Sequence, residues 1–363
     1  MFHPEAIISK ENLVHNINYI KKYVGSDVSI MPVVKANAYG HGVVEICKIL
    51  SKYNIQGFCV ALLSEVIHIR KNQINKKILH LGSIEHEFDS ILLDQNLILT
   101  INNNDDILFL NRVGKMNNHQ FKVHIKIDTG MTRLGILKEE METIKISLDK
   151  SNFVIAEGVY SQLSSADEDD ESCTINQRNE FIEISDYFCF HFNTIKYKHL
   201  TASAGLLKNK KNHFSMVRPG ISLYGINNIS ESHPLKPVLC LKASVCLIKN
   251  VKKGSDIGYN RTFTNENDDM QIAIIQIGYA DGIPLEFSNN GYVEYEGKKL
   301  NILGKVSMDL ICVCIDGIDI KKGDKVIVYG GELTKLEILL KDMISTPYSI
   351  LTGISSRVKR IFN

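Results

Sequence analysis

Short apolar runs alternate with amphipathic segments over the first 225 residues of the chain. Eight of the runs are typical of buried strands, and apolar residues at helical spacing separate most of them. The expected strands cover residues 28–34, 57–61, 78–81, 97–101, 121–127, 153–161, 197–201 and 222–225. Strands that alternate with helices form parallel sheets, so eight such units predict a (β/α)8 barrel of the TIM type.

A different pattern begins near His233. Two prolines mark a junction there, and strand-like runs separated by Gly and Asp turns dominate the rest of the chain. One helix is expected over residues 335–343. We therefore expect an α/β fold in two parts, with a barrel over residues 1–232 and a smaller, mostly β domain over residues 233–363.

Composition excludes several classes of function. The 363 residues are 44% hydrophobic, and the formal net charge of +1 gives no general attraction to nucleic acid. No run approaches the ~20 apolar residues of a membrane-spanning helix. The eight cysteines are scattered without a C-x-x-C pair, which favours reduced core thiols over disulfides or metal ligands. We expect a cytoplasmic protein that binds no nucleic acid, membrane or metal.

A lysine follows the first apolar run. Residues 28–34 are followed by Lys35, small residues, Tyr39 and two glycines. A lysine at the carboxyl end of a buried strand is costly unless its charge is used or removed. A Schiff base with an aldehyde cofactor would remove the charge, whereas a side chain that reaches solvent would keep it. Lys35 alone leaves both interpretations open.

Other polar residues also follow expected strands, where the active sites of such barrels lie. Asp128 and Arg133 follow the fifth strand, and Lys126 lies inside it. Ser203 follows the seventh strand, and Arg218 precedes the eighth. A barrel would bring these side chains to one rim.

Several stretches, taken in order, resemble the motifs of the alanine racemase family. They are residues 33–42, 126–135, 217–221, 278–282 and 307–309. The resemblance covers essentially the whole chain. It implies a barrel with a C-terminal β domain, pyridoxal 5'-phosphate (PLP) as cofactor, an amino acid as substrate, and a homodimer with shared active sites. The implied reaction interconverts L- and D-alanine, and the D form supplies peptidoglycan precursors in a bacterium.

The resemblance also implies a role for each site residue. Two catalytic bases are expected on opposite faces of the substrate, namely Lys35, which also holds PLP, and Tyr259 of the partner subunit. The cofactor-binding residues are expected to be Lys35, Tyr39, Arg133, Ser203, Arg218, Gly220, Ile221 and Tyr348. The substrate is expected to lie against Arg133, Met308 and Asp309. The supporting and access-path residues are expected to be Lys126, Gln162, Asp167 and Tyr279.

The chemistry of racemisation explains why these residue types are needed. PLP acts as an electron sink that makes the Cα–H of a bound amino acid acidic. Inversion then needs a base on one face of Cα and an acid on the other. An arginine beside the pyridine nitrogen is informative because a guanidinium practically never loses its proton, so the ring nitrogen accepts a hydrogen bond and stays unprotonated.

The chain departs from the family's common pattern at several positions. Gln162 stands where a histidine is common, Ala202 where an asparagine is common, and Leu285 and Lys305 where arginines are common. These departures leave turnover, pH profile and substrate breadth open. A serine or broad-specificity racemase is the nearest rival interpretation, and Met308 favours alanine. Two further classes are a PLP-dependent decarboxylase of the same barrel family, against which Arg218 argues, and a non-catalytic PLP carrier, against which the long C-terminal domain with Tyr259 and Asp309 argues.

Overall fold

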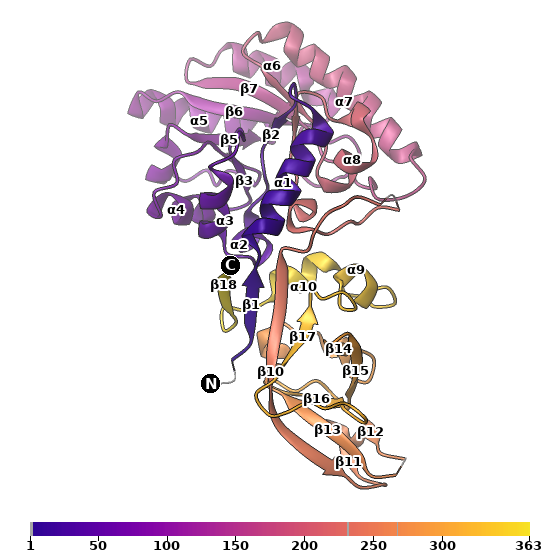
Figure 1. Cartoon of the computed structure of the whole chain (residues 1–363). Helices are drawn as coiled ribbons and strands as arrows, with labels where there is room; N and C mark the ends of the chain where they lie inside the picture. Colours follow the sequence, from indigo (N-terminus) through magenta and orange to yellow (C-terminus); the bar gives the residue numbers. More distant parts are fainter. Residues whose placement is uncertain (1–2, 231, 267) are drawn as a thin grey trace.

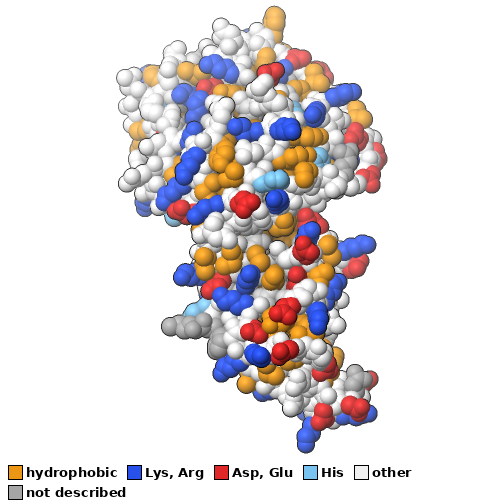
Figure 2. Space-filling model, in the orientation of Figure 1, with side chains coloured by type: hydrophobic (Ala, Val, Ile, Leu, Met, Phe, Trp, Pro, Cys, Tyr) orange, Lys and Arg blue, Asp and Glu red, His pale blue; other side chains and the backbone are white. Residues whose placement is uncertain are grey.

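The computed structural model describes residues 3–230, 232–266 and 268–363. It consists of a barrel and a separate, elongated β domain (Figure 1). Figure 2 shows charged side chains of both signs scattered over the visible face of both parts, as the small net charge predicts. Among the described helices, none combines the length and the hydropathy needed to cross a membrane.

Eight short parallel strands close the barrel. They are β2 (Ser29–Ile30), β3 (Phe58–Val60), β4 (Ile78–His80), β5 (Leu97–Ile101), β6 (Phe121–Lys126), β7 (Val154–Tyr160), β8 (Tyr197–His199) and β9 (Met216–Val217). Strands β3 to β8 pair in sequence order, and β2 pairs with β9. Two hydrogen bonds complete the ring, from Val34 N–H to the Cys59 carbonyl (2.9 Å) and from Arg218 N–H to the Thr201 carbonyl (3.1 Å). The predicted barrel is therefore confirmed.

Helices cover the outside of the barrel (Figure 1). Leu13, Ile17 and Ile20 form the buried stripe of the first helix, and the Ser9 hydroxyl accepts a hydrogen bond from Asn12 N–H at its start (3.1 Å). The α-helices are α1 (Lys10–Val24), α3 (Val43–Leu50), α4 (Leu63–Lys71), α5 (Asn104–Asn117), α6 (Met141–Asp149), α7 (Ser172–His191) and α8 (Ser203–Lys208). The label α2 (Lys35–Tyr39) marks a single left-handed turn. Short 3-10 helices are η1 (Ser90–Leu93), η2 (Lys138–Glu140), η3 (Lys210–Asn212) and η4 (Ile221–Tyr224).

Two of the predicted strands need correction. The strand predicted over residues 222–225 is wrong, because Ile221–Tyr224 forms the buried 3-10 helix η4. The eighth strand is β9, so Arg218 follows that strand rather than preceding it. A fully buried helical turn gives the same continuous apolar run as a buried strand. The first predicted strand is shorter than expected, because Pro32 cannot donate a ladder hydrogen bond.

The β domain is built on one curled, mostly antiparallel sheet. Its strands are β1 (Glu5–Ile8), β10 (Leu239–Val251), β13 (Met270–Ile275), β14 (Tyr292–Tyr295), β15 (Lys298–Leu303), β16 (Ile311–Cys314), β17 (Lys325–Tyr329) and β18 (Lys359–Phe362). Strand β10 pairs with β13 as well as with β17 and β1, which curls the sheet. The N-terminal strand β1 lies between β10 and β18, so it belongs to this sheet although it precedes the barrel in sequence. The division at residues 232 and 233 stays a prediction.

Small elements extend from the sheet. A two-stranded ribbon, β11 (Asp256–Ile257) with β12 (Phe263–Thr264), lies at the end of the β domain farthest from the barrel (Figure 1). Short helices are η5 (Tyr259–Arg261), η6 (Tyr279–Asp281), η7 (Leu285–Phe287), α9 (Leu336–Leu339) and α10 (Pro347–Gly353). The helix predicted over residues 335–343 is confirmed only as the single turn of α9.

Candidate active site

A cavity of about 380 Å³ opens at the carboxyl ends of the barrel strands. It brings together ten of the residues that the sequence singled out. They are Lys35, Tyr39, Arg133, Gln162, Asp167, Ser203, Arg218, Gly220, Ile221 and Tyr348. All come from the barrel except Tyr348, which α10 of the β domain supplies.

The turn that carries Lys35 and Tyr39 has an unusual backbone. Residues 36–39 all have positive φ angles between 51° and 55°, although none is glycine. A run of left-handed non-glycine residues costs about 1–2 kcal/mol each. The Asn37 carboxamide oxygen accepts from Val43 N–H (2.9 Å) and ties the turn to the following helix. A Cβ atom at Gly40 would lie 2.0 Å from the Leu351 carbonyl oxygen, so α10 packs directly against the end of this turn.

Glu65 holds the other side of the left-handed turn. One carboxylate oxygen accepts from Ala36 N–H (2.6 Å). The other accepts from Ala61 N–H (2.8 Å) and Leu62 N–H (3.1 Å) at the start of α4. This one half-buried carboxylate therefore fixes the residue after Lys35 relative to the barrel wall.

Positive charge gathers around Lys35. Burial, followed by the Arg133 guanidinium, lowers the pKa of Lys35, so its amine loses a proton more easily than an exposed lysine does. Arg133 lies on a loop shaped by Asp128, whose carboxylate accepts from the N–H groups of Gly130 (3.0 Å), Thr132 (3.0 Å) and Arg133 (3.1 Å). Asp128 therefore positions Arg133 through the backbone.

Arg218 is buried, and neutral groups hold it in place. Its guanidinium donates to His199 Nδ1 (2.5 Å), the Ser161 carbonyl (2.8 Å) and Gln162 Oε1 (3.1 Å). Because His199 Nδ1 accepts, its Nε2 carries the hydrogen and donates to His124 Nδ1 (2.8 Å). Within the described part of the chain, no carboxylate pairs with Arg218. The cavity therefore contains a buried cation that offers donors to a ligand.

Lys126 lies beside Arg218 rather than on the cavity wall. Its amine is 4.7 Å from the centre of the Tyr160 ring, and the Arg218 guanidinium carbon is 5.1 Å from the same centre. Burial, followed by repulsion from Arg218 and Arg133, lowers the pKa of Lys126 to about 7. Near neutral pH a large share of this amine is uncharged and nucleophilic.

Small residues form a cradle on the opposite side of the cavity. The Ser203 hydroxyl oxygen accepts from Gly220 N–H (3.0 Å), which ties α8 to the loop after β9. A Cβ atom at Gly220 would lie 2.6 Å from the Tyr39 hydroxyl oxygen, so a larger residue here would displace the Tyr39 side chain. The Tyr348 ring centre lies 6.2 Å from that of Tyr39. Hydroxyls and a side-chain-free backbone are suited to surround a phosphate group.

Four predicted site residues of the β domain lie outside this cavity: Tyr259, Tyr279, Met308 and Asp309. The first three are 67%, 44% and 52% exposed, unusually high values for such side chains. Tyr259 lies between β11 and β12, at the far end of the β domain from the cavity of its own chain (Figure 1).

These exposed residues lie on neighbouring loops. Tyr279 N–H donates to the Ser307 carbonyl (3.0 Å), and Ala280 N–H donates to the Met308 carbonyl (3.0 Å). A Cβ atom at Gly258 would lie 3.0 Å from Lys305 N, which places the Tyr259 turn against the same segment. We call residues 258–259, 278–282 and 307–309 the outer loop cluster.

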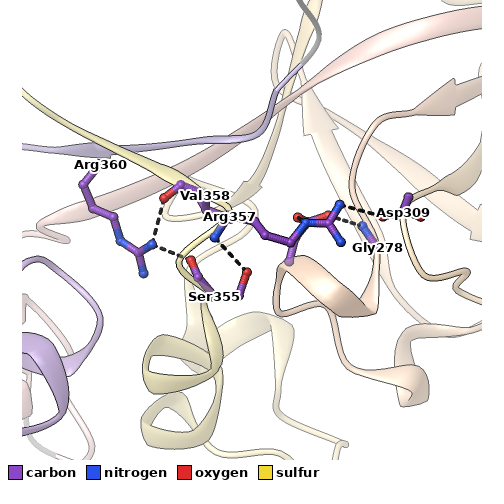
Figure 3. Close-up of polar contacts among 7 residues, drawn as sticks. Gly278, Asp309, Ser355, Arg357, Val358 and Arg360 are labelled. Atoms are coloured by element: carbon purple, nitrogen blue, oxygen red, sulfur yellow. Dashed lines mark hydrogen bonds and ion pairs between the residues drawn. The ribbon is translucent and has the colours of Figure 1, made fainter.

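Arg357 joins two parts of the outer loop cluster (Figure 3). Its guanidinium donates to Asp309 Oδ1 (2.6 Å) and lies 3.4 Å from Asp281 Oδ1. The other Asp281 oxygen accepts from Gly278 N–H (3.0 Å). The nearby Arg360, in β18, donates to the Gly40 carbonyl (3.0 Å), so residues 357–360 contact both the outer loop cluster and the Lys35 turn.

Comparison with known families shows to which family the chain belongs. A model described as "Alanine racemase, N-terminal domain" matches residues 8–228, and one described as "Alanine racemase, C-terminal domain" matches residues 238–362. The chain belongs to the alanine racemase family. Both parts of the predicted fold are thereby confirmed.

Individual relatives in the alanine racemase family agree over the full length. An alanine racemase of Halothermothrix orenii is 37% identical over 367 residues, covering 98% of this chain and 95% of the relative. The alanine racemase structure from Clostridium difficile 630 has a TM-score of 0.93 at 34% identity, covering 100% of this chain and 96% of that one. An alanine racemase of Bartonella henselae "with covalently bound pyridoxal phosphate" has a TM-score of 0.89 at 29% identity, covering 99% of each chain.

Reasoning from the sequence missed two residues that support this alanine racemase site. Glu65 could have been found from its place in the sequence, because a Glu at the third position of a helix often accepts hydrogen bonds from the N–H groups at the helix start. No sequence signal distinguishes His199 from its neighbours in a short predicted strand, and the folded barrel places it beside Arg218. Gln162, expected among the supporting residues, accepts directly from the Arg218 guanidinium through its amide oxygen.

Replacing Glu65 with glutamine tests how far this carboxylate holds the left-handed turn. The amide nitrogen of Glu65→Gln cannot accept, so the Ala36 N–H or the two N–H groups of α4 lose their charged partner. We expect the free energy of unfolding to fall by about 1.5–3 kcal/mol and cofactor content to fall with it. Thermal unfolding and absorbance of the bound cofactor measure both. Glu45→Gln on α3 is the matched control, and an equal effect of the two variants would contradict the assignment.

Proposed function

We propose that this chain is an isomerase that interconverts L- and D-alanine with PLP as its cofactor. One observation carries the proposal. In a member of the alanine racemase family, a single cavity contains a half-buried lysine, a cradle of small residues and a buried arginine that has no carboxylate partner among the described residues. These are the groups needed to hold an aldehyde, a pyridine nitrogen and a phosphate.

The residues of the cavity fit each part of PLP. Lys35, whose amine is readily deprotonated, would hold the aldehyde carbon. Ser203, Gly220 and Ile221, with the hydroxyls of Tyr39 and Tyr348, would surround the phosphate. A phosphate site after the last strands is typical of this barrel. Arg218 would donate to the pyridine nitrogen, which disfavours a decarboxylase, because decarboxylases of this fold usually have an acidic residue there.

The proton transfers are assigned to two residues. When bound, PLP supplies an electron sink that makes the Cα–H of alanine acidic. Lys35 takes or returns the proton at Cα on one face, and Tyr259 of the partner subunit does so on the other. Arg133 holds the substrate carboxylate, together with Met308 and Asp309 of the outer loop cluster. Lys126 positions Arg133, and its uncharged amine is able to take up carbon dioxide as a carbamate, with release of a proton.

Two copies of the chain are needed for this assignment. The cavity contains one base, whereas Tyr259 is exposed at the far end of the β domain of the same chain. We therefore propose a homodimer in which the outer loop cluster of each chain covers the cavity of the other. Burial of Tyr259, Tyr279 and Met308 at such an interface would also account for their exposure in one chain.

The proposed product indicates a metabolic role for the enzyme. D-Alanine made by this reaction would supply peptidoglycan precursors. We propose that the enzyme works in the cytoplasm. All eight cysteines are unpaired, as in proteins of a reducing compartment.

A panel of amino acids tests the proposed reaction. The purified protein should racemise L-alanine and D-alanine with equal kcat/KM, because the two enantiomers have the same free energy. L-Serine should be racemised more slowly, since Met308, which is proposed to lie against the substrate, favours alanine. Chiral chromatography measures both, and carbon dioxide release from basic amino acids is followed in parallel. If serine were racemised faster than alanine, serine would be the substrate. Carbon dioxide release without racemisation would contradict the proposal.

A further inference from the structure

The phosphate cradle contains a second buried serine, Ser222, which the residues assigned above do not include. Ser222 is 0% exposed and lies on η4, whereas Ser203 is 3% exposed and begins α8. Ser203 lines the cavity, and Ser222 lies behind it. Any effect of Ser222 on a ligand therefore passes through Ser203.

Three donors converge on the Ser203 hydroxyl oxygen. They are Gly220 N–H at 3.0 Å, Ser222 N–H at 3.1 Å and the Ser222 hydroxyl at 3.0 Å. A hydroxyl has two acceptor lone pairs and one hydrogen. These three donors share the two lone pairs of Ser203, so the oxygen has no place for a further donor and its hydrogen is the part left to form another bond.

The hydrogen of Ser203 has no protein partner. Across residues 3–230, 232–266 and 268–363, no acceptor receives a hydrogen bond from this hydroxyl. Because the oxygen can accept nothing more, Ser203 acts toward the cavity as a donor alone. A hydroxyl donor that lines a cavity with a buried arginine held only by neutral groups favours a ligand oxygen that carries negative charge.

We propose that Ser222 is a positioning residue for phosphate recognition, which it performs by donating its hydroxyl hydrogen to Ser203 and so committing Ser203 to donate to the phosphate of PLP. This inference rests on the proposed function. Hydrogen bonds in such a chain polarise one another, so the bond from Ser203 to a phosphate oxygen is stronger when Ser222 donates to Ser203. The effect should be specific to the phosphate, because the hydroxyl of Ser222 hydrogen-bonds to Ser203 and not to Lys35 or Arg218.

Binding of two aldehydes by the full-length protein tests this role. PLP and pyridoxal, which lacks the phosphate, are titrated against cofactor-free protein and followed by absorbance. Ser222→Ala should weaken PLP binding by about 3- to 10-fold, the effect of one lost hydrogen bond, and leave pyridoxal binding unchanged. Equal weakening for both ligands, or no weakening for PLP, would overturn the proposal.

Two further variants separate this role from a general effect on stability. In the Ser203→Ala background, Ser222→Ala should cause no further loss of PLP affinity, because the group through which it acts is gone. Ser185→Ala removes another 0% exposed serine hydroxyl, on α7, and should change neither affinity. Additive losses at Ser203 and Ser222 would contradict the relay. Wild-type protein that binds neither aldehyde would instead show that the proposed function itself is wrong.

Discussion

Lys35→Ala is expected to reduce alanine racemisation by roughly 10³-fold or more in both directions and to abolish the absorbance band of covalently bound cofactor. The amine of Lys35 is both the attachment point and one of the two bases in the proposed scheme, so one substitution removes both functions. The size of the loss distinguishes this residue from the groups that only position the cofactor. Chiral chromatography and absorbance spectroscopy measure the two effects on the same sample.

Lys52→Ala is the matched control for this experiment, because Lys52 is exposed on the outside of the barrel. It should retain the racemisation rate and the cofactor band of the wild type. A Lys35→Ala protein that still carries covalently attached cofactor would contradict the assignment. So would one that racemises alanine at a rate near that of Lys52→Ala.

Tyr259→Phe is expected to lower racemisation by roughly 10²- to 10⁴-fold while the cofactor band stays intact. Losing one of two bases stops inversion but leaves Lys35 able to exchange the Cα hydrogen on its own face. In deuterated water, the variant should therefore exchange the Cα hydrogen of one enantiomer much faster than that of the other. Mass spectrometry of recovered alanine measures the exchange, with Tyr53→Phe as the control. Equal exchange of both enantiomers, or undiminished racemisation, would contradict the two-base scheme.

Mixing two inactive variants tests whether Tyr259 acts on the other chain. After subunit exchange between Lys35→Ala and Tyr259→Phe chains, each mixed dimer has one site with both bases intact. Random exchange should restore about a quarter of the wild-type activity. If each site were built within a single chain, mixing would restore nothing.

Much of the fold could be predicted because barrel strands are short, apolar and regularly spaced. Seven of the eight predicted barrel strands overlap observed strands, and β5 is buried at every position. The eighth was misplaced because Ile221–Tyr224 has a mostly apolar sequence for a different reason, being a fully buried 3-10 turn. The place of β1 could not be predicted, since its partner β18 lies more than 350 residues away and no local pattern encodes that pairing.

The residues that line the cavity could be predicted better than the contacts that hold them in place. The rule that active sites lie at strand ends, together with the family resemblance, brought Lys35, Arg133, Ser203 and Arg218 to one rim. The left-handed turn at residues 36–39 was missed because non-glycine residues avoid that conformation by themselves. Tertiary contacts such as those from Glu65 help to hold it, and they join residues far apart in the sequence.

Borohydride reduction of the purified protein, followed by peptide mapping, tests the central claim most directly. Reduction makes the bond between the cofactor and its lysine permanent, so mass spectrometry locates the attached pyridoxyl group. We predict one modified peptide that contains Lys35, with no other lysine of the chain labelled. A protein that carries no pyridoxyl group, or carries it on a different lysine, would contradict the assignment of the site.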